Sequence, residues 1–321
     1  MTTTHARVLV VGETMGLLTS GAHLRAGGPV RFSVGGAETN TAIGLRRQGI
    51  PVRWLTRLGD DAVGESVLAA IRSEDVEAVA ALDPLRPTGL MMKEARPGGL
   101  TRVSYYRSGS AASALSAADV RVELLDGVEL LHVTGITPAL SDSAASAVIE
   151  AVRLARACDI RVSLDVNYRS SLWSREQAGE RLAGVASLAD IVFGDRQELE
   201  LLIDASTTAT VSDEALLDTI AGIGPGEVVL KRGERGAVAL ADGCVRHQAV
   251  FPITPVDTVG AGDAFVAGYL AGVLDARPLD DRLRRACACG ALACLSEGDW
   301  EGSPTVAELA AFLGGGDPVL R

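Results

Sequence analysis

The segment Asp257-Thr-Val-Gly260-Ala-Gly262-Asp263 combines residues that could bind an anion with one that could accept a proton. Gly260 and Gly262 flank one small residue, and the apolar run 264–274 that follows is typical of a helix. Glycines at a helix N-terminus let backbone N–H groups converge on an anion, which the helix dipole also attracts. An acid in the first turn is common for structural reasons alone. Beside an anion, however, a carboxylate is unfavourable unless it takes a proton from an attacking hydroxyl, so the segment predicts phosphoryl transfer with Asp263 as base.

A pair of glycines, Gly35 and Gly36, opens a second candidate segment that ends at Asn40. Paired glycines let a ligand approach the backbone closely, and the Asn40 amide can donate to and accept from hydroxyl groups. Taken alone, the segment is also typical of a turn followed by a helix cap. The sequence contains no G-x-x-x-x-G-K-[ST] motif, which excludes a P-loop as the nucleotide site.

The chain that must position these residues alternates short Val-, Ile- and Leu-rich runs with longer amphipathic stretches rich in Ala and Leu. Nearly continuous apolar strands that alternate with helices predict an α/β fold, in which a mostly parallel sheet is covered by helices on both faces. The predicted strands are 8–11, 52–55, 130–133, 161–164, 191–193 and 228–230, and the predicted helices are 39–48, 64–73, 143–157, 175–186, 197–202 and 213–221.

Two stretches interrupt this alternation. Gly, Arg and Pro residues break any helical period in 19–32, and residues 88–107 alternate around Pro97-Gly98-Gly99, which is typical of a β-hairpin. We therefore expect a small β-sheet lid inserted into one large α/β domain. The lid would comprise residues 13–34 and 88–107, and the large domain residues 1–12, 35–87 and 108–321.

The composition is that of a globular enzyme or small-molecule binder. The 47% of hydrophobic residues can form a large core, and the net charge of −11 lacks the basic face that non-specific binding of nucleic acid needs. Five cysteines without a C-x-x-C pair are typical of reduced thiols. No apolar run approaches the ~20 residues that span a bilayer, and the first run is too short for a signal peptide. We expect no nucleic-acid or membrane partner and a cytoplasmic location.

Both glycine-rich segments carry a family resemblance. GGAETNTAIGLRRQG near residue 40 and DTVGAGDAFVAGYL near residue 260 resemble the two signature regions of the ribokinase-like (PfkB) carbohydrate kinases, and their separation of about 220 residues also matches. The turn Lys231-Arg-Gly-Glu-Arg-Gly236 resembles the nucleotide-binding turn of that family. Asp195-Arg-Gln-Glu198 resembles its N-x-x-E motif, with Asp in place of Asn. The similarity extends over essentially the whole chain.

The resemblance implies a ribokinase-like fold, an ATP-dependent sugar kinase and a role for each motif. Asp263 would be the catalytic base, and the N–H groups of Gly260, Ala261 and Gly262 would form the anion hole. Asp195 and Glu198 would support Mg²⁺ through its water ligands, and a monovalent cation such as K⁺ would bind near Asp257. Homo-oligomers would form through the β lid. The residues implied for ATP are Asn167, Arg169, Lys231, Arg232, Gly233, Glu234, Arg235, Gly236, Gly260, Ala261 and Gly262.

The implied acceptor is an acid sugar. The segments GGAE, Tyr105-Tyr106-Arg107 and DVNYRSSLW (165–173) resemble those of the family members that phosphorylate 2-keto-3-deoxygluconate on its primary hydroxyl. Two arginines, Arg107 on the lid and Arg169 beyond a strand, could clamp a carboxylate, a group that a neutral sugar lacks. They could also be surface charges. The residues implied for the acceptor are Gly35, Gly36, Asn40, Met91, Tyr105, Tyr106, Arg107, Arg169, Asp263 and Asp299.

Two other functions remain open from the sequence. One is a kinase of a neutral ketose or a nucleoside, similar to fructokinase or ribokinase. The other is a noncatalytic sugar-sensing protein on the same fold, because a fold alone does not determine function. The intact Asp263 with both neighbouring glycines argues against the second.

Overall fold

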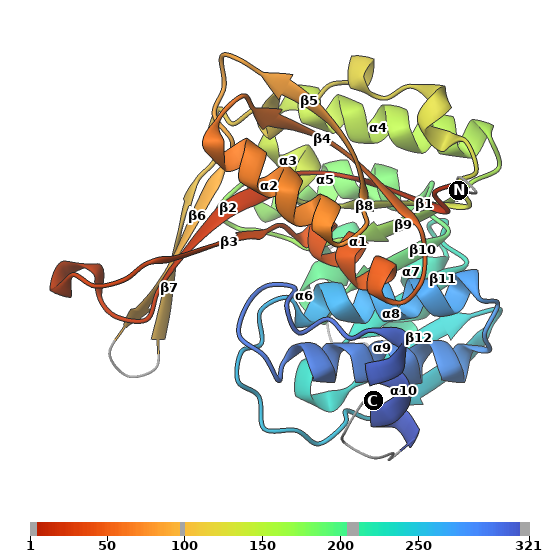
Figure 1. Cartoon of the computed structure of the whole chain (residues 1–321). Helices are drawn as coiled ribbons and strands as arrows, with labels where there is room; N and C mark the ends of the chain where they lie inside the picture. The colour runs from red at the N-terminus through yellow and green to blue at the C-terminus, as the bar shows by residue number, and fades with distance from the viewer. Residues whose placement is uncertain (1–4, 97–99, 204–211, 315–321) are drawn as a thin grey trace.

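A nine-stranded sheet forms the centre of the molecule, as the computed structural model shows for residues 5–96, 100–203 and 212–314 (Figure 1). The strand order is β13-β12-β11-β10-β9-β8-β1-β4-β5, and all neighbours from β11 to β5 are parallel. The strands are β1 (Val8–Val11), β4 (Val52–Gly59), β5 (Glu77–Asp83), β8 (Leu130–Thr134), β9 (Arg161–Asp165), β10 (Ile191–Gly194), β11 (Glu227–Lys231), β12 (Ala237–Ala241) and β13 (Cys244–Gln248). All six predicted strands are confirmed, whereas β5, β12 and β13 were not predicted.

Helices cover both faces of this sheet, as expected (Figure 1). Side chains alternate along each strand, so Leu9 and Val11 belong to the hydrophobic cluster on the face covered by α4, α5 and α7, while Val8 and Val10 belong to the cluster on the face covered by α1, α2, α8 and α9. The helices are α1 (Ala37–Arg47), α2 (Ala62–Ser73), α3 (Thr137–Leu140), α4 (Asp142–Ala157), α5 (Arg175–Ala186), α6 (Arg196–Leu199), α7 (Asp213–Ala221), α8 (Ala261–Leu274), α9 (Leu279–Ala293) and α10 (Val306–Gly314). Within the described ranges, none of them is long and apolar enough to cross a membrane.

Local capping explains where several helices begin. The hydroxyls of Ser141, Ser174 and Ser212 accept hydrogen bonds from the backbone N–H groups of the first turns of α4, α5 and α7. The predicted starts of these helices are therefore close to the observed ones. In contrast, α8 begins at Ala261, three residues before the apolar run that predicted it, because Gly260 provides its N-cap without a side chain.

The predicted lid is a four-stranded sheet that projects from the body (Figure 1). Its strands are β2 (Met15–Ser20), β3 (Arg31–Gly35), β6 (Leu90–Arg96) and β7 (Leu100–Tyr106), in the order β3-β2-β6-β7. The pairing of β6 with β7 is antiparallel and confirms the predicted hairpin; its turn at 97–99 lies outside the described residues. Because β2 and β6 pair in parallel, the sheet is mixed. Residues of this sheet face those beyond the carboxyl ends of β1, β8 and β9 across one cavity.

Candidate active site

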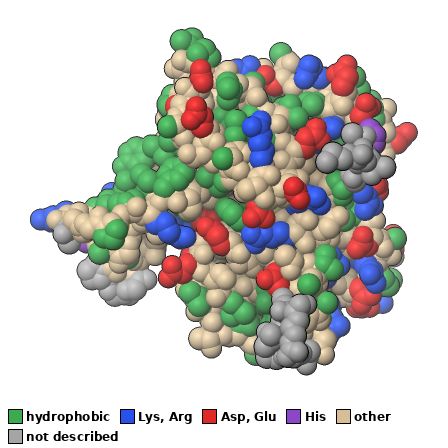
Figure 2. All heavy atoms as spheres, in the orientation of Figure 1, with side chains coloured by type: hydrophobic (Ala, Val, Ile, Leu, Met, Phe, Trp, Pro, Cys, Tyr) green, Lys and Arg blue, Asp and Glu red, His purple; other side chains and the backbone are tan. Residues whose placement is uncertain are grey.

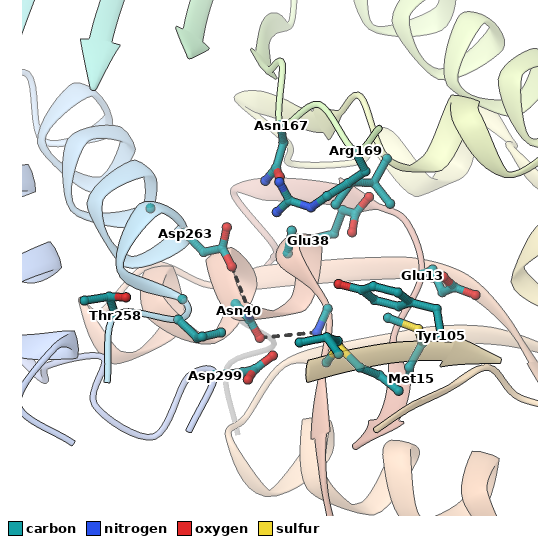
Figure 3. Close-up of a pocket in the computed structure, with 18 of the residues that line it drawn as sticks. Glu13, Met15, Glu38, Asn40, Tyr105, Asn167, Arg169, Thr258, Asp263 and Asp299 are labelled. Carbon is teal, nitrogen blue, oxygen red and sulfur yellow. Dashed lines mark hydrogen bonds between the residues drawn. The ribbon is translucent and has the colours of Figure 1, made fainter. Parts of the chain in front are cut away.

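A cavity of about 530 Å³ lies between the lid and the body (Figure 3). Its floor comes from residues at or just beyond the carboxyl ends of the parallel strands, where ligands bind in open α/β sheets. Its roof comes from the lid. The floor includes Glu13 after β1, Ile136 after β8, Asn167 and Arg169 after β9, Asp195 after β10 and Lys231 at the end of β11, and the roof includes Met15, Met91, Lys93, Val103 and Tyr105.

A second cavity of about 460 Å³ adjoins the first and is mainly apolar. It lies between the turn after β11 and the helices α8 and α9, with a wall made by the segment 250–255. Lys231, Gly233, Thr258 and Gly262 line both cavities. The two cavities therefore meet at the N-terminus of α8, where ligands bound in each would face one another.

The N-terminus of α8 has the features of an anion site that its sequence predicted. Gly260 has φ +74°, and the backbone oxygen of Asp299 fills the position in which a side chain would begin, so only glycine fits there. No side chain caps the helix, and the N–H of Ala261 makes only a long, 3.4 Å hydrogen bond to the carbonyl oxygen of Thr258. Around Gly262 the space is open, the nearest atom to an added Cβ being Lys231 Nζ at 3.9 Å.

Asp263 lies in the first turn of α8, buried at the edge of the first cavity (Figure 3). We name this cavity the acceptor cavity, because most of the residues predicted for the acceptor line it. Its Oδ2 accepts a hydrogen bond of 2.8 Å from Asn40 Nδ2. Burial raises the pKa of the Asp263 carboxyl to about 7, with a further increase from Asp165, while Asn40, Arg169 and Lys231 oppose the shift. A carboxylate with a pKa near neutrality is suited to accept a proton from a hydroxyl.

Asn40 holds Asp263 in place. Besides donating to Asp263, its Oδ1 accepts a 3.4 Å hydrogen bond from the N–H of Gly36 (Figure 3). Gly36 lines the acceptor cavity, whereas Gly35 does not and instead packs against the carboxylate of Asp299. Asn40, expected to bind the acceptor, therefore also serves as a clamp for the proposed base.

Lys231 lies where the two cavities meet and is held by a carboxylate that was not predicted. Its Nζ bonds both oxygens of the buried Asp165 at 2.7 and 2.9 Å. Burial opposes the charge on Lys231, but Asp165 and Glu198 outweigh it and raise the pKa of the lysine. Lys231 is therefore a fixed positive charge beside the N-terminus of α8.

Arg107 and Arg169 face the same cavity in different environments. Arg169 is exposed and donates to the Tyr168 carbonyl oxygen at 3.2 Å. Arg107 is buried, 3.4 Å from the carboxylate of Glu13, and its Nε and Nη2 have no hydrogen-bond partner in the described structure. Burial raises the pKa of Glu13 to about 7, against the effect of Arg107.

Of the residues predicted for ATP or for the acceptor, three line neither cavity, and Asn167 and Arg169, predicted for ATP, line only the first cavity. Tyr106 is 62% exposed and lines neither cavity, because adjacent residues of β7 point to opposite faces and Tyr105 points inward. Arg235 is exposed in the turn after β11 and also lines neither cavity, unlike the other residues of that turn. Gly35 was described above.

The predicted metal-supporting pair, Asp195 and Glu198, lines the acceptor cavity and forms a capping box for α6. Each carboxylate accepts a 2.8 Å hydrogen bond from the backbone N–H of the other residue, and Glu198 Oε1 accepts another from the N–H of Tyr168. Among the described residues, no group of three or more His, Cys, Asp or Glu side chains could hold a metal ion by itself. Asp257, expected near K⁺, accepts from the N–H of Val259 and lines neither cavity.

Several lining residues were missed by sequence reasoning. Glu13 comes two residues after the buried strand β1, a position that could have identified it. Glu38 is buried and accepts from the hydroxyls of Thr134 and Thr137, and burial raises its pKa. Thr258 lies in the glycine-rich segment 257–263, two residues before Gly260, and that position could have identified it. Lys93 carries no local signal, because only tertiary packing brings it to the cavity.

The comparisons with known proteins agree with this geometry. The family described as pfkB family carbohydrate kinase matches residues 5–306. The chain belongs to this family. This kinase is 36% identical to the 2-dehydro-3-deoxygluconokinase of Bacillus subtilis (strain 168) over 290 residues, 88% of this chain and 87% of the relative. It is 29% identical to the 2-dehydro-3-deoxygalactonokinase of Haloferax volcanii, over 97% of this chain and 98% of that one.

A solved structure gives the same result. The crystal structure of a PfkB protein from Polaromonas sp. JS666 superposes with a TM-score of 0.85 at 32% identity, over 95% of this chain and 99% of that one. The kinase is thus an enzyme that phosphorylates a sugar, and the prediction of a ribokinase-like fold with a β lid is confirmed. The alternative of a noncatalytic sugar-sensing protein was wrong.

Proposed function

We propose that this kinase transfers the γ-phosphoryl group of ATP to the primary hydroxyl of an acid sugar, with 2-keto-3-deoxygluconate as the first candidate. The observation that carries the proposal is the pair of adjoining cavities: an apolar one beside the Lys231–Gly236 turn, suited to a nucleoside, and a polar one with two arginines, suited to the acceptor. The names of the two relatives, both kinases of dehydro-deoxy sugar acids, agree with the acid acceptor.

In the proposed reaction, Asp263 accepts the proton of the primary hydroxyl as its oxygen attacks the γ-phosphorus. The new bond joins that oxygen to phosphorus, and the bond to the β-phosphate oxygen breaks, so that ADP leaves with the electron pair. The open N–H groups at the start of α8 and the ammonium of Lys231 lie where the negative charge of the transferring group would be, and both would stabilise it.

A divalent metal would fit beside this path. Asp195 and Glu198 present carboxylates at the cavity wall, and hard cations such as Mg²⁺ prefer oxygen ligands and keep several waters. When bound, Mg²⁺ neutralises charge on the phosphates. Since both carboxylates already accept backbone hydrogen bonds, their role would be to orient the waters of the ion.

Recognition of the acid would rest on Arg107 and Arg169. In the buried Arg107, Nη2 has no hydrogen-bond partner in the described structure and can donate to a carboxylate, whereas Nε lies 3.4 Å from the carboxylate of Glu13. Arg169 lines the same cavity. A second candidate, a neutral sugar, is favoured by one observation: Glu13 already lies beside Arg107 and could compete with a carboxylate for it.

The proposed acceptor can be tested with the wild-type enzyme. ADP release is measured for 2-keto-3-deoxygluconate, 2-keto-3-deoxygalactonate, fructose and ribose at matched concentrations, and thermal-shift titrations with the same sugars report binding alone. We expect turnover and stabilisation with the acid sugars. Turnover restricted to the neutral sugars would make the second candidate correct and leave the kinase assignment intact.

We also propose that residues 13–34 and 88–107 act as a lid domain through which copies of the chain associate. Leu100 and Tyr106 on the edge strand β7 are 68% and 62% exposed, and hydrophobic side chains gather where the lid leaves the body (Figure 2). An unpaired apolar edge strand invites pairing with another copy. Light scattering should give a dimer that Tyr106→Lys converts to a monomer; a monomeric wild type would refute the proposal.

A further inference from the structure

Lys93 connects the lid to the body through a buried ion pair. It lies on β6, and its Nζ is 2.5 Å from Oδ1 of Asp299 in the segment after α9. Lys93 is 8% exposed and Asp299 6% exposed, and both line the acceptor cavity. Charged residues are seldom buried to this extent unless they are paired. The pair is therefore a specific contact between two parts of the chain that are 206 residues apart.

The segment 299–301, which we name the hinge segment, makes further contacts with the lid. The indole nitrogen of Trp300 donates to the backbone oxygen of Val34 at 3.0 Å, at the end of β3. Glu301 lies 3.8 Å from Arg31 on the same strand. On its other side the segment is anchored to α1, because Arg47 Nη1 donates to the carbonyl oxygens of both Trp300 and Glu301.

The same segment touches the anion-binding end of α8. The backbone oxygen of Asp299 occupies the space in which a side chain of Gly260 would begin. Gly260 is the N-cap of α8, so a shift of Asp299 must either displace that N-terminus or open a gap beside it. Asp299 thus meets Lys93 through its side chain and Gly260 through its backbone.

We propose that Lys93 is a positioning residue that couples closure of the lid over the acceptor to the geometry of the anion-binding N-terminus of α8, through the hinge segment. The proposal rests on the proposed function only in that a sugar binds under the lid; it does not depend on which sugar.

A positive charge is needed at residue 93 because its side chain contacts the buried carboxylate of Asp299. Burial raises the pKa of Asp299, and Lys93 opposes that shift, so the ion pair favours the charged form of the carboxylate. Removing one partner of a buried ion pair leaves the other charge uncompensated, which is costly. Without Lys93, the closed arrangement would be disfavoured, and the lid and hinge segment would separate so that water could reach Asp299.

The test uses Lys93→Met, which keeps the length of the side chain and removes its charge, and Lys93→Arg, which keeps the charge. The matched control is Arg31→Met, since Arg31 also joins the lid to the hinge segment but is half-exposed and outside the cavity. Michaelis constants are measured for ATP and for whichever sugar the wild type phosphorylates. Acrylamide quenching reports the hinge segment, because Trp54 and Trp173 are buried and Trp300 is the more accessible of the three tryptophans.

We expect Lys93→Met to raise the KM for the sugar by about tenfold or more, with a smaller fall in kcat and with the KM for ATP within about threefold of wild type. Trp300 should become more accessible to quencher at saturating sugar. Lys93→Arg should recover most of the sugar affinity, and Arg31→Met should change neither constant by more than about twofold.

Two results would overturn the proposal. One is a Lys93→Met enzyme whose sugar KM and quenching equal those of wild type. The other is an equal rise in both Michaelis constants, which would indicate general destabilisation. If Lys93→Met does not fold, Lys93→Gln, which can still donate to Asp299, replaces it with the same criteria. Failure of the acid-sugar assignment would appear separately, as turnover of a neutral sugar by the wild type.

Discussion

Replacing Asp263 by Asn should nearly abolish turnover while making the folded protein more stable. Asparagine is almost isosteric, and its amide oxygen can still accept the hydrogen bond from Asn40. It cannot take a proton from the attacking hydroxyl. Loss of a general base costs about 10²–10⁴ in rate, so kcat should fall by that factor while ATP affinity stays within about threefold.

The gain in stability follows from the pKa of Asp263. Burial raises this pKa from 3.8 to about 7. Between about pH 4 and about pH 7 the folded state therefore keeps a proton that the unfolded state has already released. Stability therefore decreases as the pH rises from about 4 to about 7, and above 7 the whole penalty is present. A shift of this size corresponds to at most about 4 kcal/mol, which Asp263→Asn should recover in part at pH 8.

The assay combines ADP release with thermal unfolding at pH 6 and pH 8. Asp275→Asn, at the opposite end of α8, is the matched control and should change neither rate nor stability appreciably. For the wild type, kcat/KM should fall about tenfold per pH unit below 7 as Asp263 becomes protonated. An Asp263→Asn enzyme that keeps more than about a tenth of the wild-type rate would refute the role of Asp263 as base.

Three further substitutions test the surroundings of Asp263. Gly262→Val should reduce kcat by at least about tenfold with little loss of stability, because the added side chain would enter open space near the phosphoryl path; a variant that unfolds at the wild-type assay temperature would argue against this. Gly260→Ala should instead lower the free energy of unfolding by more than about 2 kcal/mol, since φ is +74° and the backbone oxygen of Asp299 fills the space for a side chain. Chemical denaturation measures this loss, and a smaller one would contradict the prediction. Asn40→Ala should move the midpoint of the pH–rate profile above its wild-type value, because Asn40 lowers the pKa of Asp263; an unchanged or lower midpoint would contradict the clamp.

The parts of the fold that local patterns specify were accessible from the sequence. Buried parallel strands such as β1 are apolar throughout, and helices such as α4 and α5 begin at serine caps, so both could be predicted from local sequence. The edge strand β5 was missed because most of its residues are only half-buried and its pattern is weak. The last two described strands of the chain, β12 and β13, were also missed, although β12 is fully apolar. They follow β11 without an intervening α-helix, so they do not show the alternation of strands and helices from which the other strands were predicted.

The candidate site was predictable to a similar degree. Asp263 and the glycines before it lie in one short segment, where helix physics alone suggests an anion beside a base. The contacts of Lys93 with Asp299 and of Arg107 with Glu13 join residues far apart in the chain, and no local pattern specifies such pairs. The position of Tyr106 outside both cavities could not be predicted, because a sequence motif does not show which face of a strand each residue occupies.

The central claim, that the acceptor carries a carboxylate bound by Arg107 and Arg169, is tested most directly by one comparison. It measures kcat/KM for 2-keto-3-deoxygluconate and for fructose in the wild type, Arg107→Ala and Arg169→Ala, with Arg102→Ala as a control on an exposed position of β7. A charge-assisted hydrogen bond contributes about 1.5–3 kcal/mol, so each cavity variant should lose about 10- to 150-fold with the acid sugar and much less with fructose. Wild-type preference for fructose, or equal losses with both sugars, would contradict the claim.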